Sequence, residues 1–292
     1  MAFKKATRKQ ARLRLALAGP SGSGKTYSAL RIAKGLGGKV AVIDTEHGSA
    51  SLYSGTFDFD VDEMLDDYAP KNYIAAMKDA AESGYNVIII DSITHAWNGP
   101  GGILDIVDNV AKGSRSGNSY MAWKTGTKLQ NEFVQQILSS PCHIIATMRT
   151  KTAYEITEDS NGKKAPKKMG TKPEQREGLE YEFTTVLDLS VDGHLATSSK
   201  DRTGLFDDIP FLPSEETGEK LAEWLSTGVD VRKQSADLLA KSTEEIETAE
   251  TSEEIAEIGK AASQALTKAD LGKLRKVAQK RQVELATKEE SE

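Results

Sequence analysis

Residues 19–26 read Gly19-Pro20-Ser21-Gly22-Ser23-Gly24-Lys25-Thr26 and fit the P-loop pattern G-x-x-x-x-G-K-[ST] in full. Residues 13–18, which are apolar apart from Arg14, precede this stretch and have the composition of a buried strand. Residues 27–36 follow it with helical spacing, and glycines at 35, 37 and 38 mark the end of that helix. Strand, glycine-rich loop and helix therefore occur in the order that a P-loop requires.

A loop of this kind holds phosphate groups. Its small residues let successive backbone N–H groups turn toward an anion, and the helix that follows directs its positive end at the same place. We expect Lys25 to reach the β- and γ-phosphates of a nucleotide and the Thr26 hydroxyl to be a ligand of Mg²⁺. A Gly/Ser-rich turn could match by chance, but the flanking strand and helix argue against that interpretation.

The composition is that of an ordinary globular protein. The chain has 292 residues, of which 38% are hydrophobic and 28% are charged, and its formal net charge is −6. Any binding of nucleic acid must therefore depend on a local basic patch. One cysteine excludes an intramolecular disulfide, and four scattered histidines give no zinc-site spacing. The single cysteine favours a reducing, cytoplasmic location. No apolar run reaches eighteen residues, so we expect no membrane span.

Two further apolar runs end in acidic residues. Residues 39–44 predict a strand that ends at Asp44, and residues 86–92 predict the strongest strand of the sequence, which ends at Asp91. The carboxyl ends of parallel strands face the ligand crevice of an open α/β sheet. Asp91 has the Walker B pattern and would orient Mg²⁺ or its waters beside Thr26. The sequence thus predicts an α/β fold with a mainly parallel central sheet flanked by helices.

The rest of the pattern predicts more elements. We expect strands at 57–61 and 142–148, helices at 70–83, 103–111 and 120–139, and a hairpin of 183–190 with 194–199. Trp123 is predicted to lie in the core. Residues 150–178 break the periodicity and form a basic loop, in which Asn161-Gly162 could close a small hairpin between residues 154–157 and the lysines that follow. We interpret this loop as a contact for a phosphate backbone, with a solvated lysine run as the alternative.

Changes in composition divide the chain into three parts. Residues 1–12 are basic and are expected to form a loose N-terminal arm, and residues 13–228 carry the α/β pattern. Residues 229–292 are helical and highly charged, with an acidic stretch before a basic one. Their thin apolar stripe predicts an appendage of two or three helices. This appendage could consist simply of solvated helices, or it could dock a partner.

With these motifs in place, the chain resembles the core of RecA-like recombinases. Residues 43–47 look like that family's Asp-x-Glu-His segment, which implies that Glu46 polarises the attacking water as a general base. Tyr53 matches the aromatic residue that stacks on adenine. Lys200 and Arg202 resemble the pair that reaches the γ-phosphate of the neighbouring subunit. The resemblance therefore implies ATP and Mg²⁺ as ligands and a homo-oligomer, either a ring or a filament.

The resemblance covers about residues 13–205 and has two departures. Only a dozen residues precede the first strand, so the family's N-terminal oligomerisation domain is not expected. Thr147 or Arg149 stands where the family has the glutamine that senses the γ-phosphate. A reduced RecA-like core with a basic loop is most similar to phage-encoded AAA-type or Sak-type ATPases of single-strand annealing. This similarity implies contact with single-stranded DNA through residues 150–178, during phage recombination or replication in the host cytoplasm.

The same residues leave other functions open. A small-molecule kinase would need lid arginines, and residues 150–178 offer lysines with Arg176 alone. A nucleotide-gated interaction protein could order its basic loop on ATP binding and recruit a single-strand binding protein or a nuclease. A hexameric helicase shares the Lys-x-Arg pair. We favour an ATPase that acts on single-stranded DNA, and the sequence leaves annealing, strand exchange and RNA binding undecided.

Overall fold

The computed structural model describes residues 11–113, 119–158, 164–206, 209–229, 231–263 and 265–289. The chain forms two compact units, of which the larger comprises Arg12–Leu225 and the other contains the chain from Ser226 onward. Residues 1–10 of the expected N-terminal arm lie outside the described residues. Arg12, at the end of that arm, contacts His143 with its guanidinium 3.0 Å from the ring Nε2.

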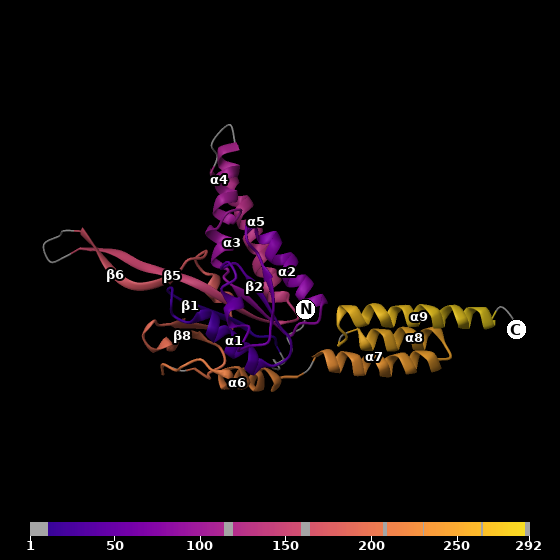
Figure 1. The fold of residues 1–292 in the computed structure, drawn as a ribbon. Coiled ribbons are helices and arrows are strands. Elements are labelled where there is room, and N and C mark those ends of the chain that lie inside the picture. The colour runs from indigo at the N-terminus through magenta and orange to yellow at the C-terminus, as the bar shows by residue number, and fades with distance from the viewer. Residues whose placement is uncertain are drawn as a thin grey trace. The chain divides into compact units, whose positions relative to one another are not determined.

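The larger unit is built on a sheet that, in the described residues, has eight strands (Figure 1). They are β1 (Arg14–Gly19), β2 (Val40–Asp44), β3 (Asp60–Glu63), β4 (Val87–Asp91), β5 (His143–Glu158), β6 (Lys164–Pro173), β7 (Thr185–Leu189) and β8 (Ala196–Asp201). Their order is β3-β2-β4-β5-β1-β7-β8, and β6 pairs with β5 outside this path. Only β6 and β8 pair antiparallel to their neighbours, which confirms the predicted mainly parallel sheet.

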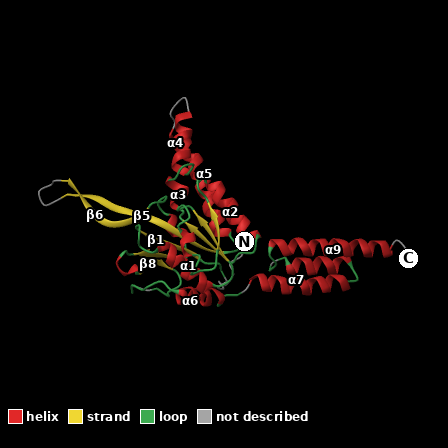
Figure 2. Cartoon of the chain, in the orientation of Figure 1, coloured by secondary structure: helices red, strands yellow, loops and turns green. Residues whose placement is uncertain are grey.

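Helices flank this sheet on both faces, and Figure 2 shows them around the strands. They are α1 (Lys25–Leu36), α2 (Pro70–Glu82), α3 (Thr94–Asn98), α4 (Ile103–Gly113), α5 (Ser119–Ser139) and α6 (Glu215–Ser226). Helices α1 and α6 pack on one face, against strand residues such as Leu15 and Ile89. Helices α2 and α5 pack on the other, against Ala16 and Ile90. Because successive strand side chains point to opposite faces, continuous apolar runs serve both layers.

Strand β5 is the largest difference from the sequence prediction. It runs to Glu158, ten residues beyond the apolar pattern, which ends at Met148. After Arg149 it leaves β1 and pairs only with β6, from Thr150 opposite Pro173 outward. The predicted basic loop at 150–178 is therefore largely a two-stranded ribbon. Its sequence does not alternate between apolar and polar residues because the ribbon packs on no core. The small hairpin of 154–157 with the lysines is confirmed, and Asn161-Gly162 lies outside the described residues.

Two smaller predictions were wrong. The third strand lies at Asp60–Glu63 and not at 57–61, and all four of its residues are exposed because it is an edge strand that pairs only with β2. Trp123 was predicted in the core, but it is 43% exposed and rests beside Trp97, with the ring centroids 6.2 Å apart. The hairpin of β7 with β8 is confirmed.

The C-terminal unit consists, in its described residues, of α7 (Val231–Thr248), α8 (Ser252–Ala262) and α9 (Lys268–Glu289). Its small core buries Ile246, Ile255 and Leu274, so the thin apolar stripe of the sequence is enough to join the three helices. Ser235 on α7 donates a hydrogen bond of 2.7 Å to the Asp270 carboxylate on α9. Among the helices that the structure describes, none combines the length and the apolar character needed to cross a membrane.

Candidate active site

The P-loop joins β1 to α1 and is shaped by two glycines with positive φ. Gly22 and Gly24 have φ values of 77° and 82°, a region that residues with a side chain rarely adopt. Helix α1 begins directly after Gly24, so its first N–H groups have no partner within the helix. The Lys25 ammonium folds back onto the loop and donates to the Pro20 carbonyl at 2.8 Å. The loop therefore presents unpaired donors at the positive end of a helix.

This loop borders a cavity of about 510 Å³. Eight of the residues predicted from the sequence line it together: Ser21, Gly22, Gly24, Lys25, Thr26, Glu46, Tyr53 and Asp91. Gly19, Pro20 and Ser23 support the loop, and the Ser23 hydroxyl donates to the Pro20 carbonyl at 2.9 Å. Strands β1, β2 and β4 end beside this cavity, as the parallel order of the sheet requires, and β5 passes it at Arg149 and Thr150.

Asp91 lies at the end of β4 and is only 2% exposed. Its two carboxylate oxygens accept hydrogen bonds of 2.5 Å from the hydroxyls of Thr26 and Thr147. Burial raises the pKa of Asp91, and these two hydroxyls lower it only in part. A cation beside the carboxylate would offset the cost of burying its charge. The adjacent oxygens of Thr26 and Asp91 fit Mg²⁺, which takes few protein ligands and keeps several waters.

Glu46 follows β2, and two side chains hold its carboxylate. The Ser92 hydroxyl donates to it at 3.1 Å, and the Arg149 guanidinium donates through Nε at 2.9 Å and also through a terminal nitrogen. Burial raises the pKa of Glu46, but the hydrogen bonds and charge of Arg149 outweigh this effect and leave the pKa below its usual value. The Asp44 carboxylate fixes the turn by accepting from the Glu46 amide at 2.6 Å. Glu46 is therefore an ionised carboxylate at the cavity, as a general base must be.

Aromatic rings form another part of the cavity wall. Tyr53 and Tyr27 line it and meet edge to face, with their centroids 5.5 Å apart. Phe57 supports Tyr27 at a centroid distance of 5.3 Å. A flat heterocyclic base fits such a wall, because aromatic rings offer large apolar contact area at fixed geometry.

Lys200 and Arg202 lie at the β8 edge of the sheet and do not line the P-loop cavity. The Lys200 ammonium donates to the carbonyls of Glu180 at 3.0 Å and Tyr181 at 2.5 Å. Arg202 donates to the same Tyr181 carbonyl at 3.2 Å. Burial lowers the pKa of Lys200, and the neighbouring Arg202 charge lowers it further. The structure thus brings the P-loop, Asp91, Glu46 and Tyr53 together and leaves this pair apart from them.

Sequence reasoning missed several residues that line the cavity or hold the side chains that line it. The P-loop prediction gave no role to Ser92, although it directly follows Asp91 and holds Glu46. Thr147 and Arg149 were considered only as alternative sensors, whereas the structure gives them different partners, Asp91 and Glu46. Glu174 also lines the cavity, and no sequence signal marks it, because it arrives there through the return of the ribbon.

Comparison with protein families agrees with this geometry. A family model described as an AAA domain matches residues 11–253, which is most of the chain. The chain therefore belongs to this AAA-domain family, and it is a P-loop AAA-like ATPase by class. A search among curated proteins returned no match. The match spans the whole larger unit and extends into the C-terminal helices.

Proposed function

We propose that this protein is a Mg²⁺-dependent ATPase that acts on single-stranded DNA, in an annealing or mediator role in phage recombination or replication. The main support for this proposal is the course of strand β5. Its residue Arg149 lines the nucleotide cavity and its buried Thr147 holds Asp91, and the strand then continues as one side of the lysine-rich β5–β6 ribbon. A nucleotide on the P-loop and a polyanion on the ribbon would therefore contact the same strand.

The side chains of the cavity suit hydrolysis of a phosphoanhydride. Lys25 and the free N–H groups of the loop bind the phosphates, and ionised Glu46 accepts the proton of the attacking water. Bound Mg²⁺, held by Thr26 and Asp91, would neutralise charge on the phosphate oxygens. In the structure Glu46 is paired with Arg149. The γ-phosphate of ATP competes for that guanidinium, and Glu46 is then free to orient water.

The ribbon suits the backbone of a nucleic acid. Lys151 faces Lys172 in its ladder, and Lys164, Lys167 and Lys168 are further members of β6. Lysines bind phosphates as point charges, and each contact releases counterions from the nucleic acid. Because the chain as a whole carries a charge of −6, a local basic element is what DNA binding requires.

Steady-state ATPase activity with and without single-stranded DNA, across a salt series, tests this proposal. We expect the DNA to stimulate turnover and the stimulation to fade steeply as salt rises. A turnover rate that is the same with and without DNA at every salt concentration would contradict the proposal and favour a kinase or a nucleotide-gated interaction protein.

The position of Lys200 and Arg202 outside their own cavity supports a head-to-tail homo-oligomer in which they serve the neighbouring site. Mixing Lys25→Ala protein with Arg202→Ala protein tests this arrangement. Some interfaces then join an intact P-loop to an intact arginine, so we expect partial recovery of ATPase activity. No recovery at any mixing ratio would argue against a shared site.

A further inference from the structure

A second cavity, of about 250 Å³, lies at the base of the ribbon. Trp97 of α3, Lys151 of β5, Lys172 of β6 and Arg176 line it, and Glu174 lines both this cavity and the nucleotide cavity. Neither the P-loop chemistry nor the family match gives a role to this cavity. It adjoins the nucleotide cavity through strand β5, on which Arg149 lines one and Lys151 the other.

Two lysines face each other at this cavity. Lys151 and Lys172 are direct partners in the antiparallel ladder, and both are exposed. Neither forms an ion pair within the described part of the chain. Like charges directly opposite each other destabilise a sheet, so this arrangement costs stability in the free protein. An anion held between the two ammonium groups would remove that cost, and Arg176 adds a third positive charge.

The rest of the lining excludes a simple anion. Three carboxylates, those of Glu174, Glu177 and Glu180, also line the cavity and would repel a second negative group. They are hydrogen-bond acceptors, so the buried part of the ligand must offer N–H donors. Trp97 adds an aromatic surface of the kind on which nucleobases stack. The ligand must therefore combine a negative group for the lysines, N–H donors for the carboxylates and a flat ring for Trp97. A nucleotide whose base has an amino group meets these three requirements.

We propose that this cavity binds one nucleotide of single-stranded DNA, with its phosphate between Lys151 and Lys172 and its base beside Trp97. The exocyclic amino group of cytosine or adenine then faces the carboxylates, whereas thymine has no such group. The cavity therefore prefers cytosine to thymine. This inference rests on the proposed binding of single-stranded DNA and adds a site and a base preference to it.

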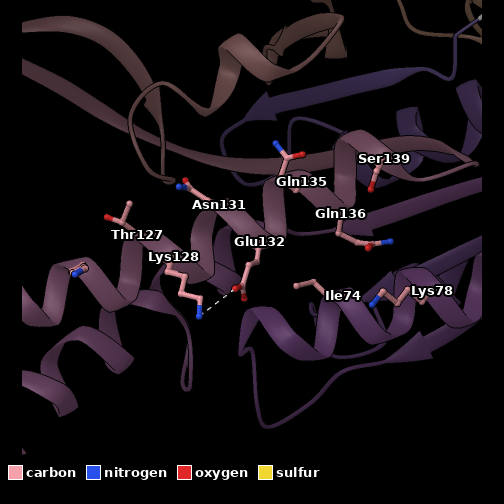
Figure 3. Close-up of a pocket in the computed structure, with 10 residues that line it drawn as sticks. Ile74, Lys78, Thr127, Lys128, Asn131, Glu132, Gln135, Gln136 and Ser139 are labelled. Atoms are coloured by element: carbon pink, nitrogen blue, oxygen red, sulfur yellow. Dashed lines mark ion pairs between the residues drawn. The ribbon is translucent and has the colours of Figure 1, made fainter. Parts of the chain in front are cut away.

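A groove between α2 and α5 offers a matched control (Figure 3). It is larger, about 680 Å³, and its lining includes Lys78, Lys128 and Gln135. Lys128 is paired with Glu132 at 3.9 Å, and no aromatic residue is among those that line the groove. Lys78 is exposed, like Lys172, but has no like-charged ladder partner. Neutralising Lys78 thus removes the same charge without touching the ribbon.

The experiment measures the affinity of the full chain for oligo-dC and oligo-dT of equal length, above neutral pH, across a salt series. For the wild type we expect oligo-dC to bind about fivefold more tightly or better. Lys172→Gln should weaken the binding of both oligonucleotides, because the lost contact is to the phosphate, and reduce the salt slope by about 0.7. It should also raise the melting temperature of the free protein by about 1 °C, because the like-charge contact is gone. Lys78→Gln should change neither the base preference nor the melting temperature.

Equal affinity of wild type and Lys172→Gln for oligo-dC, or equal binding of oligo-dC and oligo-dT by the wild type, would overturn the inference and leave the proposed function intact. A wild type that binds neither oligonucleotide would overturn both. A fall in melting temperature together with the loss of affinity would show a structural role for Lys172 and would also contradict the proposal. Lys151→Gln provides an independent repeat on the opposite strand.

Discussion

The two ends of the central sheet both bury charged side chains, but their partners differ in kind. At the carboxyl ends, Glu46 and Asp91 are held by side chains: Arg149, Thr26 and Thr147. Side-chain partners can turn away when a ligand competes for them. Glu46, Asp91, Arg149 and Thr26 line the nucleotide cavity, where such a competitor would bind, whereas Thr147 is fully buried beside Asp91.

At the amino ends, Arg14 is bound by the backbone instead. Its guanidinium donates to the carbonyls of Leu13 at 2.7 Å, Cys142 at 2.8 Å, Leu138 at 3.0 Å and Ser140 at 2.5 Å. Two of these carbonyls belong to the end of α5 and the turn after it, where helical partners are missing. A buried charge that is bound by backbone carbonyls therefore indicates a role in stability. A buried charge that is bound by side chains, which a ligand can replace, indicates a role in function.

The largest expected effect is on catalysis. Lys25→Ala removes the one ammonium group of the P-loop, so ATP turnover should fall about 10³-fold, which is about 4 kcal/mol of transition-state stabilisation. The free energy of unfolding should change little, because the hydrogen bond of Lys25 goes to the Pro20 carbonyl of its own loop. Steady-state kinetics and urea unfolding on the same preparation separate the two quantities. Normal turnover in this variant would remove the P-loop from the proposed chemistry.

For Arg14→Met we expect the opposite result, a large loss of stability and little effect on turnover. It leaves several buried carbonyls without a donor, and we expect a loss of about 3–4 kcal/mol in the free energy of unfolding. The fraction that remains folded should hydrolyse ATP at the wild-type rate. If stability were unchanged while turnover fell, the assignment of the amino end to stability would be wrong.

His143 makes the same end sensitive to pH. Burial lowers its pKa to about 4, with further lowering by Arg12 and Arg14. Its Nδ1 accepts a hydrogen bond from the Leu13 amide at 3.1 Å, which protonation removes. The unfolded chain has the higher pKa, about 6.5, so the contribution is complete above pH 6.5 and is lost as pH falls toward 4. We expect a loss of about 3 kcal/mol over that range.

Urea unfolding of the wild type between those two pH values checks this effect, and His143→Asn serves as the control. Asparagine keeps an acceptor but does not titrate, so its free energy of unfolding should depend much less on pH. Identical pH profiles for the two proteins would show that the acid sensitivity arises elsewhere.

Arg149→Ala tests the side-chain contact of Glu46 at the carboxyl ends of the strands. It has the smallest expected effect, a loss of about tenfold in kcat. Burial raises the pKa of Glu46, and Arg149 is the largest of the influences that lower it, so removing Arg149 raises the pKa. The acid limb of the pH profile of kcat/KM, which reports the pKa of the free enzyme, should move to higher pH. Arg149→Lys keeps a positive charge and should shift the limb less. An unmoved acid limb would mean that Glu46 is not the titrating group.

Local patterns explain how much of this could be predicted. The P-loop, the strand ends at Asp44 and Asp91, and the β7–β8 hairpin are each encoded within a few neighbouring residues. The pair of Glu46 with Arg149 joins residues 103 positions apart and depends on the strand order β2-β4-β5. A sequence pattern contains no such order. The ribbon was taken for a loop for a related reason, since two strands without a core leave no apolar alternation to detect.

Surface placement was equally hard to predict. Trp123 has the apolar character of a core residue, but in the structure it is 43% exposed and rests beside Trp97. Lys200 and Arg202 were identified by resemblance, and their distance from their own cavity follows from β8 being the edge strand. Their action on a neighbouring copy stays a prediction.

The central claim is that the exchangeable carboxylate Glu46 performs the chemistry of the cavity. The most direct measurement is ATP binding and ATP turnover by Glu46→Gln, which preserves shape and removes the negative charge. The account predicts that this variant still binds ATP and that its turnover falls by about 10²–10⁴-fold. A turnover rate equal to that of the wild type would contradict it.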